Sequence, residues 1–287
     1  IWNYAPLIPE LKSSMDISKK TPEYLYPIEN REYQKDDKEA HMQIAINMFN
    51  RKKWGLMYKS IKLYEKKYGI DSNNDLNEYL KANAVLKTAI QKGEQSTTKM
   101  AVNMFENLAG VTSNFKMKKA ILKYLIDYFI AKKDDVQILK FSKKLYVTSQ
   151  KNLDFEESKR ALNAIFYSLA SLGQLDRMNE LTLDKSVRKL MPEQKVLSYK
   201  IYSLMKQQNI DKAIALFKKE ESRLLSPVEY SILYNIGEAY FRKAQYQKSI
   251  KLFDKFLVSY SYMTKSGNAR LRISLSYELL GDNNQKT

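Results

Sequence analysis

Residues 226–281 read SPVEYSILYNIGEAYFRKAQYQKSIKLFDKFLVSYSYMTKSGNARLRISLSYELLG, and this stretch decides the fold. Its first residues favour the start of a helix. Ser226 offers a capping hydroxyl, Pro227 tolerates the first helical position, and Glu229 has a carboxylate placed to bond back to the cap. We therefore expect a helix to begin at Ser226 and Pro227.

The rest of the stretch repeats one order of apolar and polar residues. Apolar residues recur at helical spacing over 232–241, and Gly237 lies inside this stripe, where a hydrogen side chain lets a neighbouring helix approach closely. A polar turn at 244–247 is followed by a second apolar stripe over 250–257. The same order returns in 271–281. The pattern predicts a helical hairpin followed by the first helix of another.

Equivalent turns recur along the whole chain from residue 38 onward. The turn residues are Lys52, Gly93, Lys133, Gly173, Gln208, Ala244 and Gly281, with successive spacings of 41, 40, 40, 35, 36 and 37 residues. Each hairpin leaves an apolar face that it cannot cover alone, so a steady period indicates stacked neighbours. Strand signals are nearly absent. We expect an all-α solenoid over 37–287, made of about six hairpins and a partial one.

Several helix ends are also marked in the sequence. Gly69 is placed to end a helix, Asp154 to cap one with Glu157 in the reciprocal position, and Pro192 to occupy a first helical position. The second helix of the fourth hairpin, after the turn at Gly173, has the least clear pattern.

Residues 1–36 do not follow the repeat. They contain Pro6, Pro9, Pro22 and Pro27, which break any long helix, yet they are too apolar for a free linker. We expect an extended segment that packs on the array, or the tail of an upstream domain. We also expect the parent protein to continue at both ends.

Composition limits the function classes. The chain has no cysteine, which excludes disulfides and thiolate catalysis, and it has no long apolar run that would predict a transmembrane helix. Its net charge of +17 raises the question of nucleic acid or anionic lipid as a partner. The alternative is that the lysines cover solvated helix faces.

The sequence contains few side chains in patterns typical of catalysis. His41 is the single histidine, and its place near the start of an amphipathic helix favours a partly buried polar residue. No nucleotide-binding, phosphate-loop or paired-histidine motif occurs. The acidic pairs at 36–37, 134–135 and 156–157 lie at turns or helix starts, where capping explains them. We expect no catalytic residue, no metal site and no cofactor.

The stretch that decides the fold resembles the tetratricopeptide repeats. The family's apolar, Leu-Gly, Tyr, small and Phe positions fall on Leu233, Ile236, Gly237, Tyr240, Tyr246, Ser249 and Phe253. The period is longer than the family's usual ~34 residues. In this respect the chain looks like the repeats of bacterial envelope proteins such as the outer-membrane assembly lipoproteins.

The resemblance implies a right-handed superhelical α-solenoid in which the first helices line a concave groove. The groove positions that it implies are Tyr167, Tyr202, Glu238 and Leu275 in one column, Asn163, Ser198, Tyr234 and Leu271 in a second, and Ser171, Lys206 and Arg242 one turn further. Tyrosine beside Lys or Arg suits a peptide that carries acidic groups. The alternative is that these tyrosines pack between repeats. If they lie in the groove, replacing Tyr202 and Tyr234 by Ala should leave folding intact.

These observations favour a non-catalytic scaffold in a multiprotein bacterial assembly. The longer repeats suggest a periplasmic component of a motility (flagellar), secretion or envelope-building machine, with the cytoplasm as the alternative location. The partners that we expect are peptides or domains of other proteins docked in the groove, rather than nucleic acid or a small-molecule substrate. The alternative function is binding of nucleic acid or an anionic membrane through the Lys-rich surface.

Overall fold

The computed structural model describes residues 38–69 and 74–281, which form helices joined by turns and contain no strand. The predicted all-α fold is confirmed. The predicted N-terminal segment, residues 1–36, lies outside the described residues. No helix in the described ranges is both long and apolar enough to cross a bilayer. The chain divides into two compact units, Ile1–Lys132 and Lys133–Thr287.

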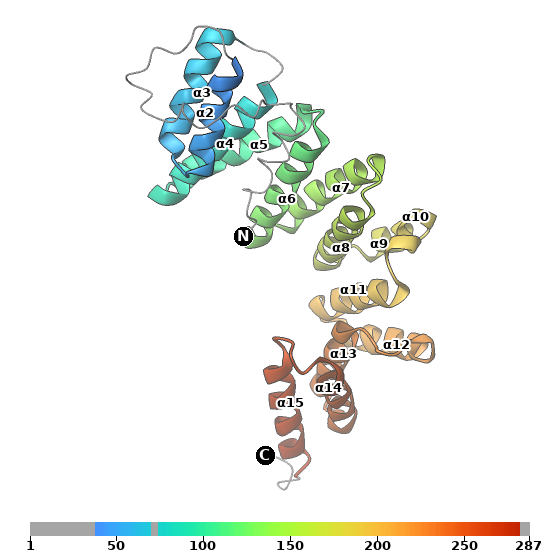
Figure 1. Cartoon of the computed structure of the whole chain (residues 1–287). Coiled ribbons are helices and arrows are strands. Elements are labelled where there is room, and N and C mark those ends of the chain that lie inside the picture. Colours follow the sequence, from blue (N-terminus) through green and yellow to red (C-terminus); the bar gives the residue numbers. More distant parts are fainter. Residues whose placement is uncertain (1–37, 70–73, 282–287) are drawn as a thin grey trace. The chain divides into compact units, whose positions relative to one another are not determined.

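Unit 1 is a series of helices that pack in chain order (Figure 1). Its described helices are α2 (Lys38–Asn50), α3 (Trp54–Tyr68), α4 (Asn74–Lys92), α5 (Gln95–Val111) and α6 (Phe115–Lys132). Each packs on the next, so the first two predicted hairpins are confirmed. A hydrogen bond from the Thr112 hydroxyl to the Asp75 carboxylate joins residues 37 positions apart, close to the length of one repeat.

Unit 2 stacks the first helices of successive hairpins into a column (Figure 1). Its helices are α7 (Asp135–Lys151), α8 (Phe155–Ser171), α9 (Leu175–Leu181), α10 (Lys185–Leu190), α11 (Glu193–Lys206), α12 (Ile210–Glu220), the 3₁₀ turn η2 (Glu221–Arg223), α13 (Tyr230–Arg242), α14 (Tyr246–Tyr260) and α15 (Ser266–Leu279). The column runs α8, α11, α13, α15, and each member contacts the next. The predicted third hairpin joins α6 to α7 across the boundary of the units, and its pairing stays a prediction.

The predicted turn residues share one backbone conformation. All seven have a positive φ, and four of them are not glycine: Lys52, Lys133, Gln208 and Ala244, with φ of 59°, 56°, 61° and 54°. A left-handed residue after the last helical turn reverses the chain, and it costs a non-glycine residue about 1–2 kcal/mol. The turn positions read from the sequence are therefore confirmed.

The predicted close approach at Gly237 is also present. The Ser249 hydroxyl donates a hydrogen bond of 2.9 Å to the Gly237 carbonyl, and a Cβ at Gly237 would lie 3.0 Å from the ring of Phe253. Ser249 and Phe253 are both fully buried. Ser249, Gly237 and Phe253 thus allow α13 and α14 to pack closely. The repeat pattern in the sequence marks these three positions.

The start of α13 differs from the prediction. The helix begins at Tyr230, with Glu229 as its N-cap, and not at Ser226 and Pro227. The backbone N–H of Glu229 donates to Gln194 Oε1 at 3.2 Å, and its carboxylate pairs with Lys195 Nζ at 3.0 Å. Both partners come from α11. The helix start is set by the preceding hairpin, which a local capping pattern cannot show.

Other predicted helix ends are closer to the structure. Gly69 ends α3 with a φ of 70°, and the Asp154 carboxylate accepts the backbone N–H of Glu157 at 3.1 Å. Pro192 is the N-cap of α11, one residue before the predicted position.

The fourth hairpin is irregular. In place of one second helix it has the short α9 and α10, separated at Thr182–Asp184. The Asp184 carboxylate accepts the backbone N–H of Ser186 at 2.7 Å and so begins α10 as a new helix. Both short helices pack on α8. This break explains why the sequence pattern after Gly173 is unclear.

Replacing Gly237 by Val should destabilise unit 2. The added side chain meets the buried Phe253 ring, and overpacking of this kind costs about 1–3 kcal/mol. The matched control is Gly267→Val in α15, where a Cβ has nothing within 4 Å and the expected change is within about 0.5 kcal/mol. Urea denaturation followed by circular dichroism measures both. Equal midpoints for the two variants would contradict the close approach.

Candidate binding groove

A groove opens along the column formed by α11, α13 and α15, and its volume is 520 Å³. It is lined by Tyr202, Met205, Lys206, Gln208, Tyr234, Asn235, Glu238, Arg242, Asn268, Leu271 and Arg272. Six of the predicted partner-binding residues are in this set: Tyr202, Lys206, Tyr234, Glu238, Arg242 and Leu271. The first helices of consecutive hairpins therefore do line one groove in unit 2.

A buried carboxylate organises the charges of the groove. Glu238 is 8% exposed and accepts two hydrogen bonds from Arg272, from Nε at 2.9 Å and from Nη2 at 2.8 Å. Arg242 Nε lies 3.5 Å from the same carboxylate, and Arg242 Nη1 donates to Gln208 Oε1 at 3.1 Å. One carboxylate thus faces two guanidinium groups, which leaves positive charge in the groove.

A third cation lies at the end of α11. Lys206 Nζ donates to the Ser171 hydroxyl and lies 3.6 Å from Asp135 Oδ2. The Ser171 hydroxyl in turn donates to the Asp135 carboxylate. This chain of contacts holds the lysine head beside the groove, and it places the predicted position Ser171 next to Lys206.

The aromatic residues in and beside the groove differ in how much of their ring faces is exposed. Tyr202 stacks on Tyr167 with ring centroids 5.9 Å apart and an interplanar angle of 18°, and Tyr167 is 42% exposed. Burial is the main cause that raises the pKa of Tyr167, and the neighbouring Tyr202 adds to it, so the Tyr167 hydroxyl stays protonated. This pair offers a flat apolar surface with donors at its edge.

Tyr234 belongs partly to the core. Its ring meets Phe253 and Phe256 edge-on, with centroids 5.6 and 5.7 Å away, and Lys265 Nζ lies 4.3 Å from its centroid. Replacing Tyr234 by Ala would therefore disturb the core as well as the groove. Tyr202 likewise packs against a core cluster, whereas Arg242 is exposed and is therefore the cleaner residue for a binding test.

Five predicted residues do not line the groove: Asn163, Ser198, Leu275, Ser171 and Tyr167. Asn163 accepts a hydrogen bond of 3.1 Å from the Tyr199 hydroxyl, which ties α8 to α11. Ser198 is 3% exposed and donates to the Lys195 carbonyl at 2.7 Å. Leu275 is half-buried on α15. These three residues connect or fill the hairpins. Tyr167 is exposed beside the groove, through its stacking on Tyr202.

Sequence reasoning missed five groove residues, namely Met205, Gln208, Asn235, Asn268 and Arg272. Asn268, Leu271 and Arg272 have the spacing that shares one face of a helix. Arg272 also follows Glu238 by 34 residues, close to the repeat length. A search for opposite charges one repeat apart would have found this pair.

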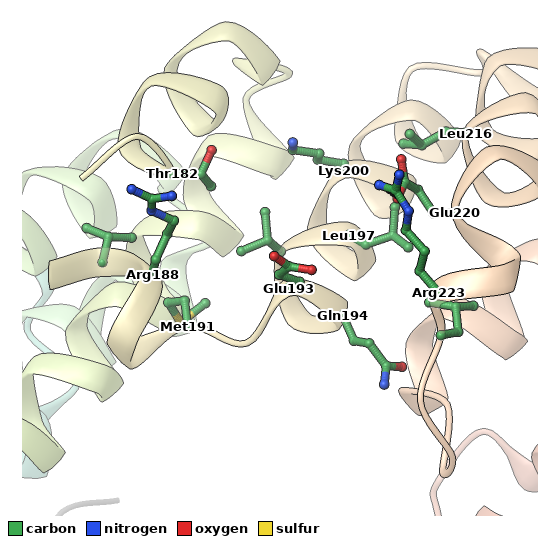
Figure 2. Close-up of a pocket in the computed structure, with 13 residues that line it drawn as sticks. Thr182, Arg188, Met191, Glu193, Gln194, Leu197, Lys200, Leu216, Glu220 and Arg223 are labelled. Carbon is green, nitrogen blue, oxygen red and sulfur yellow. Dashed lines mark ion pairs between the residues drawn. The ribbon is translucent and has the colours of Figure 1, made fainter. Parts of the chain in front are cut away.

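A second pocket, of 380 Å³, lies between α10, α11 and α12. Figure 2 shows Arg188 and Met191 on one side of it, Glu220 and Arg223 on the other, and α11 between them. Lys200 lines this pocket and Tyr202 lines the groove. Because a helix turns about 100° per residue, two residues apart point about 160° away from each other. The pocket and the groove therefore use opposite faces of α11.

His41 in unit 1 is half-buried, as predicted, and its ring centroid lies 5.4 Å from that of Tyr68. It lines an apolar hollow of 400 Å³ together with Ile44, Leu63 and Tyr64. Within residues 38–69 and 74–281, no group of three or more His, Asp or Glu side chains is arranged to hold a metal ion.

Comparisons with known proteins add little. No family model matches the chain, and no curated protein matches it. Among solved structures, it is similar to human IFIT1, determined as a dimer with m7Gppp-AAAA. That match has 13% sequence identity, covers 97% of this chain and 70% of that chain, and has a TM-score of 0.35.

The Glu238–Arg272 pair should be energetically coupled. A double-mutant cycle with Glu238→Gln and Arg272→Gln is expected to give a coupling of about 1 kcal/mol, because the carboxylate is buried and bound through two hydrogen bonds while solvent still screens the arginine. The control cycle uses Lys243 and Asp211, which pair at 2.9 Å on the surface and should couple by less than about 0.5 kcal/mol. Urea denaturation of each variant supplies the values. Equal coupling in both cycles would contradict the special role of the buried carboxylate.

Proposed function

We propose that unit 2 is a non-catalytic scaffold that binds an acidic peptide segment of a partner protein in the groove of α11, α13 and α15. The observation that carries this proposal is the juxtaposition of the Tyr167–Tyr202 stack and Lys206 with Arg242 and Arg272, the two arginines that share the buried carboxylate of Glu238. Aromatic rings give contact area at low entropic cost, and cations at the rim select acidic groups.

The hydrogen bonds of the groove favour a carboxylate ligand. An arginine has five N–H donors. Arg272 donates from Nε and Nη2 to Glu238. Arg242 donates from Nη1 to Gln208, and its Nε forms an ion pair with Glu238 at 3.5 Å, so each guanidinium retains donors for a ligand. Glu238 also fixes the two guanidinium groups before a ligand arrives. Such preorganisation reduces the entropic cost of binding.

The length of the groove favours a peptide over a small molecule. It runs along three consecutive first helices, and its lining on α13 extends from Tyr234 to Arg242, the last residue of that helix. An extended or helical peptide can follow such a surface and place alternate side chains against the rings and the cations. The tetratricopeptide-type pattern in 226–281 supports the same mode of binding.

The setting that we propose is a multiprotein bacterial assembly in the periplasm, such as a motility, secretion or envelope-building machine. The support is the long repeat, with spacings of 35 to 41 residues between turns. Fractionation of the native cells with an antibody against this chain tests it. Recovery in the cytoplasmic fraction alone would contradict the periplasmic setting and leave the groove proposal in place.

A second candidate is binding of nucleic acid or an anionic membrane, and the net charge of +17 favours it. Binding of this kind releases counterions, so its affinity falls steeply with salt. Titration of labelled single-stranded RNA and of vesicles with anionic lipid, at low and high salt, separates it from binding in the groove.

Groove variants should lose peptide binding without loss of fold. A random peptide library displayed on phage is selected against the purified chain, and acidic clones are expected to dominate. Tyr202→Ala and Arg242→Ala should each weaken binding of these clones by about five- to tenfold, because one ring face or one charged donor is lost. Fluorescence anisotropy with a synthetic copy of a selected peptide measures the affinity.

The matched controls are Tyr262→Ala and Arg270→Ala. Tyr262 is 77% exposed, Arg270 is exposed on α15, and neither lines the groove. Both controls should bind the peptide as the unchanged chain does. Selection of basic clones, or equal weakening by the groove and control variants, would reject the proposed site.

A further inference from the structure

The pocket on the opposite face of α11 lies beside the break in the fourth hairpin, and Thr182 from that break lines it. The two short helices on either side of the break, α9 and α10, pack on α8. The space beside them is the 380 Å³ pocket between α10, α11 and α12 (Figure 2). Its volume falls in the range of sites that hold one ligand group.

The floor of the pocket is apolar and firmly packed. Val187 and Met191 from the α10 region are 1% and 2% exposed, and Val196 and Leu197 from α11 are each 8% exposed. These side chains belong to two core clusters, so the floor is rigid. Rigid apolar pockets are where buried anchor side chains of a partner contribute most to affinity.

The rim carries more positive than negative charge. Its cations are Arg188, Lys200 and Arg223, and its anions are Glu193 and Glu220. Glu220 lies 3.5 Å from Arg223 Nη1, which offsets one charge of each sign. The charge of Glu220 also acts on Lys200. With three cations against two anions among its lining side chains, the rim keeps one net positive charge.

Lys200 is the most informative of these groups. It is half-buried on the wall of the pocket, and burial lowers its pKa while the charge of Glu220 opposes that effect. A partly desolvated ammonium gains more from an incoming carboxylate than a fully solvated one does. The apolar floor and this cation therefore recognise two adjacent parts of one ligand.

We propose that this pocket is a second docking site, which takes an apolar anchor side chain of a partner protein with an acidic residue beside it, the anchor on the floor and the carboxylate on Lys200 and Arg188. Charge complementarity selects this occupant over a basic segment. The site is independent of the groove because it uses the other face of α11. The chain could then hold two partner segments at once.

Two methionines make the proposal testable by methyl NMR. Met191 lies in the pocket and Met205 lines the groove, so their methyl signals report the two sites separately. The probe is a synthetic Gly-Ser peptide in which glutamates flank one Phe. It should shift the Met191 signal in a saturable way. The same peptide with Lys in place of Glu should bind at least about fivefold more weakly, because the rim is cationic.

Variants of the chain complete the test. Lys200→Gln should weaken the Met191 response about five- to tenfold, which corresponds to the loss of one charged hydrogen bond. Thr182→Trp should abolish it by filling the pocket. The control Arg242→Ala changes an exposed groove residue on α13 and should leave the Met191 response unchanged. Thermal melting followed by circular dichroism confirms that each variant is folded.

Three outcomes would overturn the proposal. The first is a Met191 signal that does not move at millimolar probe. The second is an equal shift with the basic peptide, which would mean that the rim does not select charge. The third is a shift of Met205 alone, lost in Arg242→Ala, which would assign the peptide to the groove and so support the proposed function without this second site.

Discussion

A helical hairpin cannot bury its own apolar face, and the structure of this chain follows from that constraint. In unit 2 the column α8, α11, α13 and α15 covers each face with the next hairpin, and hydrogen bonds between residues about one repeat apart accompany the packing. Asn163 with Tyr199 and Glu238 with Arg272 are two examples. Stability is then close to a sum over neighbouring interfaces.

The groove arises from the same constraint. Because the first helices stack in a column, their outward residues come together from sequence positions about 35 residues apart, as Lys206 and Ser171 do. The hydrogen bonds that join neighbouring hairpins also hold the cations of the groove in place. Glu238 serves both purposes, since it ties α15 to α13 and holds two arginines ready for a ligand.

The sequence predicted the structural features that depend on local contacts or on the repeat period. The turn at Ala244, the close helix approach at Gly237 and the cap at Asp154 were readable because each depends on residues close in the chain or on one helical spacing. The start of α13 was not readable, since Gln194 from another hairpin accepts the backbone N–H of its N-cap residue, Glu229. Arg272 was missed because the family register selects Leu271 and Leu275 on α15, whereas the groove is lined by Asn268, Leu271 and Arg272.

The non-glycine turns have a consequence for how such folds can be recognised. Four of the seven turn residues, among them Lys52 and Gln208, adopt the left-handed conformation without being glycine. Packing of the hairpin therefore dictates the turn, and the identity of the turn residue carries little information about it. A sequence profile that weights glycine at this place would score those four turns as mismatches. A helical repeat can consequently keep its architecture with lysine at the turn, and a sequence profile built from repeats with glycine there will not match it.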